Sequence, residues 1–388
     1  MSKLKVAALQ GLSASSDAIT LANDGTCTAN ITNNLSNRNK IINGSQQIFQ
    51  RGTSELRTGG NDGYYNGIAD RWAIRMHSSM GQTTFSQDTS DTPDGFGSSQ
   101  KLVRANAGSS NAAKYFVYDT RLEGQDLQDF AKGTSSAKKF TLSFYVKTGV
   151  SGVYCIEMRD LDNSRMVGGT YTVSNTNWNR YTLSFPADTT GKFDNDNGAS
   201  LWVRFWLAAG SSFTSGTART TWGSFSGADL AVGQTAQVGD NPADTWQITG
   251  VQLEVDQTGS GVATDFEHRS FGQELALCQR YYETHNSLTT AKTTDGSITS
   301  QWSTITSNDS NTLVVSTGII YKVPKRASPT VTIYNPGDTT TAARVNAQGT
   351  ERTVTASYGG PNALTRIYVS GASAGNYVTY NWEASAEL

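Results

Sequence analysis

The sequence is poor in charged residues, histidine and proline, and it contains only three cysteines. Charged residues make up 16% of its 388 residues, and the formal net charge is -2, whereas a typical globular protein is about one quarter charged. This balance excludes the strong basic field with which many proteins attract nucleic acid. The apolar runs are shorter than the roughly 20 residues that cross a bilayer, so neither membrane insertion nor a signal-peptide core is predicted.

The three cysteines lie far apart, at Cys27, Cys155 and Cys278. They form no CxxC pair and no zinc-ligand spacing, and they are expected to be reduced and mostly buried. The three histidines are equally isolated, which predicts no histidine metal site. The stretch 194–198 resembles the start of a calcium loop but lacks its late carboxylate. We therefore expect no metal and no cofactor.

Catalytic patterns are also scarce. No Gly-x-Ser-x-Gly elbow or phosphate-binding loop occurs in the sequence. The close carboxylates Asp160 and Asp162, and likewise Asp194 and Asp196, fall in turn sequences, where Asp usually caps its own backbone. The prediction is a protein that is not an enzyme and has no catalytic residues.

What the chain has in abundance is Ser, Thr, Asn and 38 Gly, together with 10% aromatic residues. Thr favours strands, whereas Gly and Asn favour tight turns. Apolar and polar residues alternate over 139–147, 178–185, 201–207 and 246–255, which is the pattern of half-buried strands. A Gly-containing turn after 139–147 suggests a hairpin with 152–159.

Many short strands separated by turns predict an all-β protein. The expected order is an extended N-terminal arm over 1–40, a jelly-roll β-sandwich over 41–270, a linking helix over 271–283 and a C-terminal β-sandwich over 284–388. The helix is indicated by apolar residues three and four apart, and a second short helix is expected near 123–130.

Aromatic residues supply the functional hint, and the candidates are Tyr64, Tyr65, Trp202, Trp206 and Trp222. Trp202 and Trp206 lie opposite the apolar stripe of their strand. Sugar rings stack on exposed aromatic faces, but aromatic residues are also enriched in protein interfaces. Glycan binding and interface packing both remain open for these five residues.

Several segments resemble a known family. The segment Asn39–Thr53, the triplet Asp70-Arg71-Trp72, and the blocks 248–254, 263–269 and 274–282 resemble a jelly-roll domain of bacteriophage appendage and tail-fibre-like proteins. The likeness extends over roughly 39–283, and the end of the chain, 383–388, is also similar to that of such proteins.

This resemblance implies a carbohydrate-binding-module-like jelly roll in a virion structural protein that assembles in the host cytoplasm. It implies a homotrimer that attaches to other virion proteins, of the tail or the capsid, through residues 1–40. A host-surface polysaccharide is the expected external partner. Two alternatives are a capsid decoration or knob protein and a virion-associated glycan depolymerase.

Overall fold

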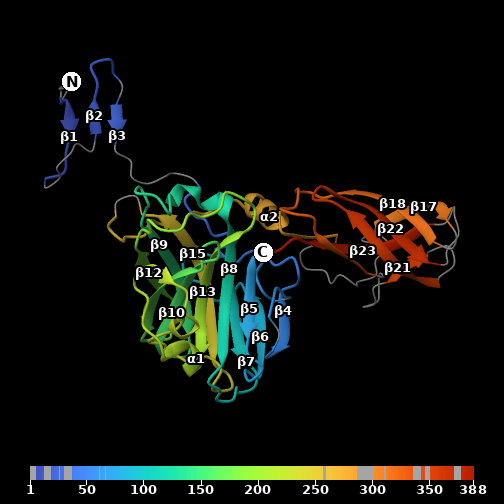
Figure 1. Cartoon of the computed structure of the whole chain (residues 1–388), viewed down its shortest axis with the longest axis horizontal. Coiled ribbons are helices and arrows are strands. Elements are labelled where there is room, and N and C mark those ends of the chain that lie inside the picture. The colour runs from blue at the N-terminus through green and yellow to red at the C-terminus, as the bar shows by residue number, and fades with distance from the viewer. Residues whose placement is uncertain are drawn as a thin grey trace.

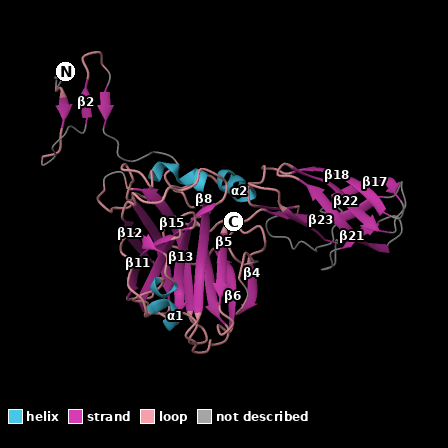
Figure 2. Cartoon of the chain, in the orientation of Figure 1, coloured by secondary structure: helices cyan, strands magenta, loops and turns pink. Residues whose placement is uncertain are grey.

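Most of the regular secondary structure is β-strand, as Figure 2 shows, which confirms the predicted all-β fold. The computed structural model describes residues 6–12, 19–25, 27–29, 37–60, 62–65, 67–256, 259–285, 301–309, 312–334, 342–345, 350–370 and 377–388. Within these residues the strands form four antiparallel sheets, of three, six, six and eight strands.

The first sheet belongs to the N-terminal segment and is drawn apart from the body in Figure 1. It consists of β1 (Ala8–Leu9), β2 (Ile19–Leu21) and β3 (Cys27–Ala29). The predicted β pattern around Ile19 and Leu21 is the middle strand of this sheet. The rest of the predicted arm up to Asn37 lies largely outside the described residues.

Two six-stranded sheets form the jelly roll. The front sheet has the order β14 (Gly223–Ser224), β11 (Arg165–Val173), β10 (Gly152–Asp160), β13 (Ala199–Ala209), β8 (Tyr115–Glu123) and β5 (Trp72–Met76). The back sheet has the order β12 (Asn179–Phe185), β9 (Phe140–Thr148), β15 (Thr245–Val255), β7 (Ser99–Arg104), β6 (Gln82–Asp88) and β4 (Ser54–Thr58).

Alternation along the strands places one core between these two sheets. Leu201, Val203 and Phe205 of β13 point into it and are at most 1% exposed. Trp72 and Tyr118 stack inside the core with their ring centroids 4.7 Å apart. Burying a large apolar side chain contributes roughly 1.5–3 kcal/mol, so a continuous core of this kind holds the two sheets together.

The predicted hairpin between 139–147 and 152–159 is wrong. β9 pairs with β12 and β15 in the back sheet, whereas β10 pairs with β11 and β13 in the front sheet. The short turn between β9 and β10 therefore crosses from one sheet to the other. Phe144 and Tyr154 are both fully buried in the shared core, because each strand turns its apolar face towards the opposite sheet.

A glycine shapes the back sheet at β15. The pairing of β15 with β9 shifts its register between Thr249 and Gln252. Gly250 lies within this irregularity with φ +63, and a Cβ there would lie 2.7 Å from the ring of Phe96 and 2.9 Å from that of Tyr145. Only glycine fits this position without strain.

In the described part of the chain the helices are few and short: η1 (Gly124–Phe130), α1 (Ser211–Thr214), η2 (Gly227–Asp229) and α2 (Phe271–Gln279). The predicted helix near 123–130 is the 3-10 helix η1. The linking helix α2 begins with a capping box between Ser270 and Gln273. It ends at Gln279, before the predicted boundary at 283, because Tyr282–Thr284 forms a strand with the C-terminal sheet.

The C-terminal sheet contains β16 (Tyr282–Thr284), β23 (Tyr377–Ser385), β17 (Gln301–Asp309), β18 (Thr312–Ile320), β22 (Ala363–Ser370), β21 (Thr350–Gly359) and β20 (Ala342–Val345), and β19 (Thr330–Tyr334) also pairs with β23. It has its own core, which includes Leu364, Ile367 and Tyr380. The domain boundaries at 40, 270 and 283 stay predictions.

Ion pairs join this C-terminal unit to the jelly roll. The carboxylate of Glu387 contacts Arg71 and lies 2.9 Å from Arg51. The Arg71 guanidinium also stacks 3.5 Å from the ring centroid of Tyr281. The C-terminus consequently lies beside β5, between the two units, as Figure 1 shows.

Candidate binding face

The outer face of the front sheet carries a row of long polar and aromatic side chains. Strand register places Arg159 of β10 beside Trp202 of β13, and Trp202 beside Arg121 of β8. The next outward position of β13 is Arg204, which lies between Glu157 and Asp119. Because alternate residues of a strand share a face, the buried stripe of β13 forces Trp202 and Arg204 outward together.

Aromatic rings hold the guanidinium groups of this face. Trp202 contacts three of them, with ring-centroid distances of 3.1 Å for Arg204, 4.2 Å for Arg121 and 4.7 Å for Arg75. Such cation–π contacts favour a fixed position of the cation over the ring. We call these three arginines, together with Arg159 and Trp202, the arginine face.

The fourth guanidinium group, that of Arg159, contacts a different aromatic ring. Arg159 lies 3.7 Å from the ring centroid of Phe225, which is 36% exposed. Phe225 directly follows β14, the edge strand of the front sheet. The arginine face therefore extends from β5 to the far edge of this sheet.

Two of the four arginines have carboxylate partners. Arg204 is 3.2 Å from Glu157, and Arg75 is 2.7 Å from Asp119, and both carboxylates are completely buried. Arg121 and Arg159 are partly exposed, and neither side chain has a hydrogen-bonded or ion-paired partner among the described residues.

Burial lowers the pKa of Arg121 and of Arg159 from the ordinary value, and this effect is partly opposed by Tyr64 and Asp119 for Arg121 and by Glu157 for Arg159. Arginine nevertheless stays charged at neutral pH. The face thus carries two positive charges without a paired carboxylate.

Several buried polar atoms here also lack a partner among the described residues. They are Nε1 of Trp202, Oδ1 of Asp119 and Nε of Arg121, Arg159 and Arg204. Trp202 is only 9% exposed and Asp119 is 0% exposed. Buried polar groups are normally hydrogen-bonded, so this concentration of atoms without a partner sets the arginine face apart from the rest of the sheet.

Two further aromatic residues predicted from the sequence lie at the borders of this face. The hydroxyl of Tyr64 donates to the backbone oxygen of Leu388 at 3.1 Å, and burial raises the pKa of Tyr64 to about 12. Trp206 is 2% exposed and donates from Nε1 to Glu157 at 3.1 Å. Its ring packs against Phe213, a position that favours packing over glycan contact.

The other two predicted aromatic residues lie elsewhere. The ring of Tyr65 lies 3.7 Å from the Arg57 guanidinium and packs partly against the main core. Trp222 also packs against that core and donates from Nε1 to the backbone oxygen of Pro186 at 3.0 Å. The structure therefore does not bring Tyr65 and Trp222 together with Trp202.

The sequence reasoning missed the four arginines and Phe225. The arginines occupy the polar positions of four strands with alternating or apolar sequences, for example Ile74-Arg75 and Val203-Arg204. Alternation alone would have assigned each of them to an outer face. Their convergence depends on strand order, which the alternation does not specify.

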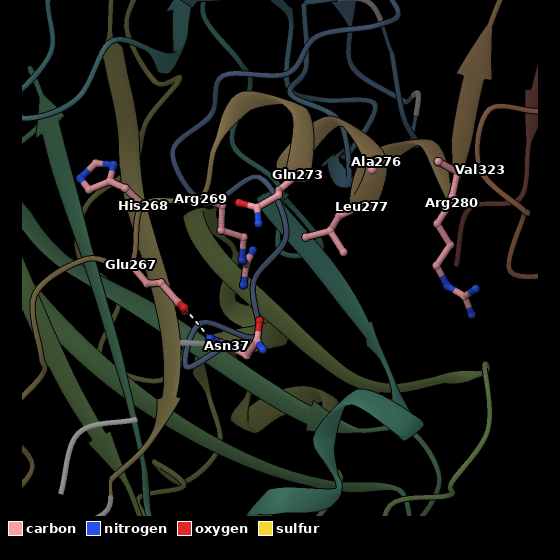
Figure 3. Close-up of a pocket in the computed structure, with 9 residues that line it drawn as sticks. All are labelled: Asn37, Glu267, His268, Arg269, Gln273, Ala276, Leu277, Arg280 and Val323. Atoms are coloured by element: carbon pink, nitrogen blue, oxygen red, sulfur yellow. Dashed lines mark hydrogen bonds between the residues drawn. The ribbon is translucent and has the colours of Figure 1, made fainter. Parts of the chain in front are cut away.

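A pocket of about 610 Å³ lies beside α2, as drawn in Figure 3. It is lined by Asn37, Glu267, His268, Arg269, Gln273, Ala276, Leu277, Arg280 and Val323.

The charged groups of this pocket are occupied by the protein itself. Glu267 accepts hydrogen bonds from the backbone nitrogens of Asn37 and Asn39, Arg269 donates to Ile41, and Arg280 pairs with Glu123. Their role is to hold the root of the N-terminal segment and α2 on the jelly roll, so this pocket is the weaker candidate.

A smaller pocket, of about 130 Å³, reaches Cys155. Burial raises the pKa of the Cys155 thiol to about 12, so this thiol is a poor nucleophile at neutral pH. Cys155 and Cys278 are both free and buried, as predicted, and the side chain of Cys27 lies outside the described residues.

The carboxylates singled out in the sequence have structural contacts. Asp160 is fully buried and pairs with Lys132, and Asp196 accepts a hydrogen bond from the backbone of Gly198 at 2.8 Å. Within the described part of the chain, no three His, Cys, Asp or Glu residues are grouped as metal ligands. Among the helices of the described segments, none is long and apolar enough to cross a membrane.

Comparison with known proteins finds no matching protein family and no matching curated protein. Solved structures do match. A protein described as a family 4 carbohydrate-binding module is 14% identical, covers 56% of this chain and 99% of its own, and has a TM-score of 0.28.

Two more structures cover a similar share of the chain. The xylan-binding domain CBM22-1 of Paenibacillus barcinonensis Xyn10C is 11% identical over 54% of this chain and 90% of its own, with a TM-score of 0.24. A cyclase from Fischerella sp. is 12% identical over 57% and 96%, with a TM-score of 0.31. Scores this low carry no argument about function, and none of these proteins is described as viral.

Proposed function

We propose that this chain is a non-enzymatic structural subunit of a bacteriophage particle, of the tail-fibre or appendage kind, whose jelly roll contacts glycan on the host surface. The observation that carries the glycan contact is the arginine face, where the partly exposed Arg121 and Arg159 flank Trp202 without an ion-paired carboxylate among the described residues. The phage assignment rests on the sequence resemblance over roughly 39–283.

Assembly is the second part of this function. The subunit forms a homotrimer, resides in the virion after assembly in the host cytoplasm, and attaches to tail or capsid proteins through residues 1–40. Ion pairs support such a role, because the buried pair Arg71–Glu387 and the partly exposed pair Arg280–Glu123 connect the jelly roll with the end of the chain and with the end of α2.

The absence of catalysis is part of the same proposal. The buried carboxylates nearest to the arginine face, Glu157 and Asp119, are each paired with an arginine, and Asp160 is paired with Lys132. Glycoside hydrolysis needs two opposed carboxyl groups that are free to exchange protons. Carboxylates held in ion pairs support a structural role.

The test uses isolated surface polysaccharide of the host. Purified protein is expected to bind the polysaccharide and to leave its chain length unchanged in size-exclusion chromatography. Trp202→Ala is expected to weaken binding at least tenfold, because Trp202 positions three of the arginines. Shortened chains would favour a depolymerase, and no binding by the wild-type protein would refute the glycan contact.

The position of this subunit in the phage particle is tested separately, by its copy number. Quantitative mass spectrometry of purified virions is expected to find the chain at a few copies per particle. A copy number that matches the capsomers of the shell would favour a capsid decoration protein instead. Absence of the chain from the particle would refute the virion assignment.

A further inference from the structure

The chemistry of the arginine face selects among glycans. Arg121 and Arg159 offer planar guanidinium groups with no carboxylate partner among the described residues. A guanidinium group binds a carboxylate or a phosphate through two parallel hydrogen bonds, and charge-assisted bonds of this kind are about twice as strong as neutral ones. A neutral sugar would leave both charges unpaired.

The spacing of the two charges points to a polymer. Arg159 and Arg121 flank Trp202 in register across β10, β13 and β8. Neighbouring strands lie about 4.8 Å apart, so the two backbone positions are roughly 10 Å apart. A single small anion reaches one guanidinium group, whereas a chain with repeated charges reaches both.

The unpaired atoms between the arginines are themselves buried. Trp202 Nε1 and Asp119 Oδ1 both lack a partner among the described residues, but Trp202 is 9% exposed and Asp119 is 0% exposed. Arg121 and Arg159 are partly exposed. Their guanidinium groups are therefore the groups of this face that a ligand contacts.

Both cations of the face also have aromatic contacts within the protein. Trp202 contacts Arg121, and Phe225 contacts Arg159, so both cations are positioned by rings of the same sheet. Groups that are already ordered lose less conformational entropy on binding. Preorganised cations favour recognition of a defined spacing of anions over general attraction by charge.

We infer that the arginine face recognises an acidic polysaccharide, with Arg121 and Arg159 binding oxyanions along the chain. This inference rests on the proposed glycan contact and names its substrate class. The oxyanion is the carboxylate of a uronic acid or the phosphate of a teichoic acid, because one guanidinium chemistry binds both.

The test measures retention of the full-length protein in affinity gels. The gels contain polygalacturonate, its methyl ester, a glycerol-phosphate teichoic acid or poly-L-glutamate. The variant Arg121→Gln/Arg159→Gln removes both unpaired charges, and Arg366→Gln is the control, since Arg366 is exposed on β22 and distant in sequence from the arginine face. Unfolding temperatures of all variants report whether they are folded.

The wild-type protein is expected to bind polygalacturonate or the teichoic acid at least tenfold more tightly than the methyl ester or poly-L-glutamate. The double variant is expected to lose at least tenfold in affinity, and Arg366→Gln is expected to keep it. Added salt should weaken the interaction because it screens partly exposed charges. The preferred acidic polymer then identifies the oxyanion as carboxylate or phosphate.

Other outcomes overturn the inference. Equal retention by the methyl ester, with the double variant unaffected, would leave glycan contact in place but refute recognition of an acid. Equal retention by poly-L-glutamate would show that charge alone suffices and would favour an acidic protein partner. If no polymer and no host polysaccharide binds the wild-type protein, both this inference and the glycan contact fail.

Discussion

The ion pairs of Glu387 make the strongest quantitative prediction about stability. Its carboxylate contacts Arg71 and lies 2.9 Å from Arg51, and these side chains are 7%, 1% and 7% exposed, respectively. Burial opposes the charge of Arg71, but Glu387 raises the pKa of Arg71 above its ordinary value. The Glu387 carboxylate therefore compensates the buried positive charges of Arg71 and Arg51 at the junction of the two units.

Glu387→Gln removes this charge while keeping the size of the side chain. Removing one partner of a buried ion pair costs about 3–5 kcal/mol, because the other charge stays buried without compensation. Arg51 keeps Asp70 at 3.7 Å, so the lower end, about 3 kcal/mol, is expected. Most of this cost comes from Arg71.

Urea unfolding followed by tryptophan fluorescence measures this free energy. Glu55→Gln is the matched control, because Glu55 pairs with Arg57 at 3.0 Å on the partly exposed strand β4. Exposed pairs contribute about 0.2–1 kcal/mol, so the control is expected to stay within about 1 kcal/mol of the wild type.

A loss of less than about 1 kcal/mol for Glu387→Gln would refute the reasoning, since it would equal that of an exposed pair. A double-mutant cycle with Arg71→Met gives a second check. Because the two groups compensate each other, the double variant is expected to lose less stability than the two single variants together. Strict additivity would show that the contact carries no coupling.

Further predictions concern the jelly roll. Lys132→Met is expected to cost about 3–5 kcal/mol in urea unfolding, because a fully buried carboxylate loses its cation; a loss below 1 kcal/mol would contradict this. Burial, partly opposed by Arg51, raises the pKa of Asp70 from 3.8 to about 6. Because the folded state disfavours the ionised form, the stability of the wild type relative to Asp70→Asn should fall by about 3 kcal/mol as the pH rises from about 4 to 6. A rise in relative stability over this pH range would contradict the prediction. Gly250→Ala is expected to lower the free energy of unfolding by about 1–3 kcal/mol. Gly227→Ala is the control and is expected to lower it much less, because a Cβ at Gly227 would meet open space. Equal losses of stability in the two variants would exclude the steric explanation. Native Cys155 is expected to resist alkylation at pH 7, as site-resolved mass spectrometry would show, and fast labelling would contradict its burial.

Periodicity was enough to predict the strands. The alternation of 201–207 places Leu201, Val203 and Phe205 in the core and Trp202 outside it, as the structure has them. It was not enough to predict pairing. Apolar and polar residues alternate in the same way whether two consecutive strands form a hairpin or belong to opposite sheets. The alternation therefore could not show that 139–147 and 152–159 lie in different sheets, and their predicted pairing was wrong.

The predicted end of the linking helix α2 was wrong for a related reason. The spacing of Leu275, Cys278 and Tyr282 favours a helix through 282, but β23 offers Tyr282 a strand partner at Ser385. Ser385 is separated from Tyr282 by about a hundred residues. Tertiary pairing overrides a local helical preference when it supplies hydrogen bonds that the helix end would otherwise lack.

The sequence by itself determined the fold class, the outward position of Trp202 and the buried state of Cys155 and Cys278, because each follows from local pattern or residue chemistry. Only the tertiary structure decided that Arg121 and Arg159, which are 38 residues apart in the sequence, flank Trp202 across adjacent strands. The order of strands in an antiparallel sheet depends on how the apolar side chains of all the strands pack together into one core. A chain with a net charge of -2 can therefore concentrate unpaired positive charge on one face without any basic run in its sequence.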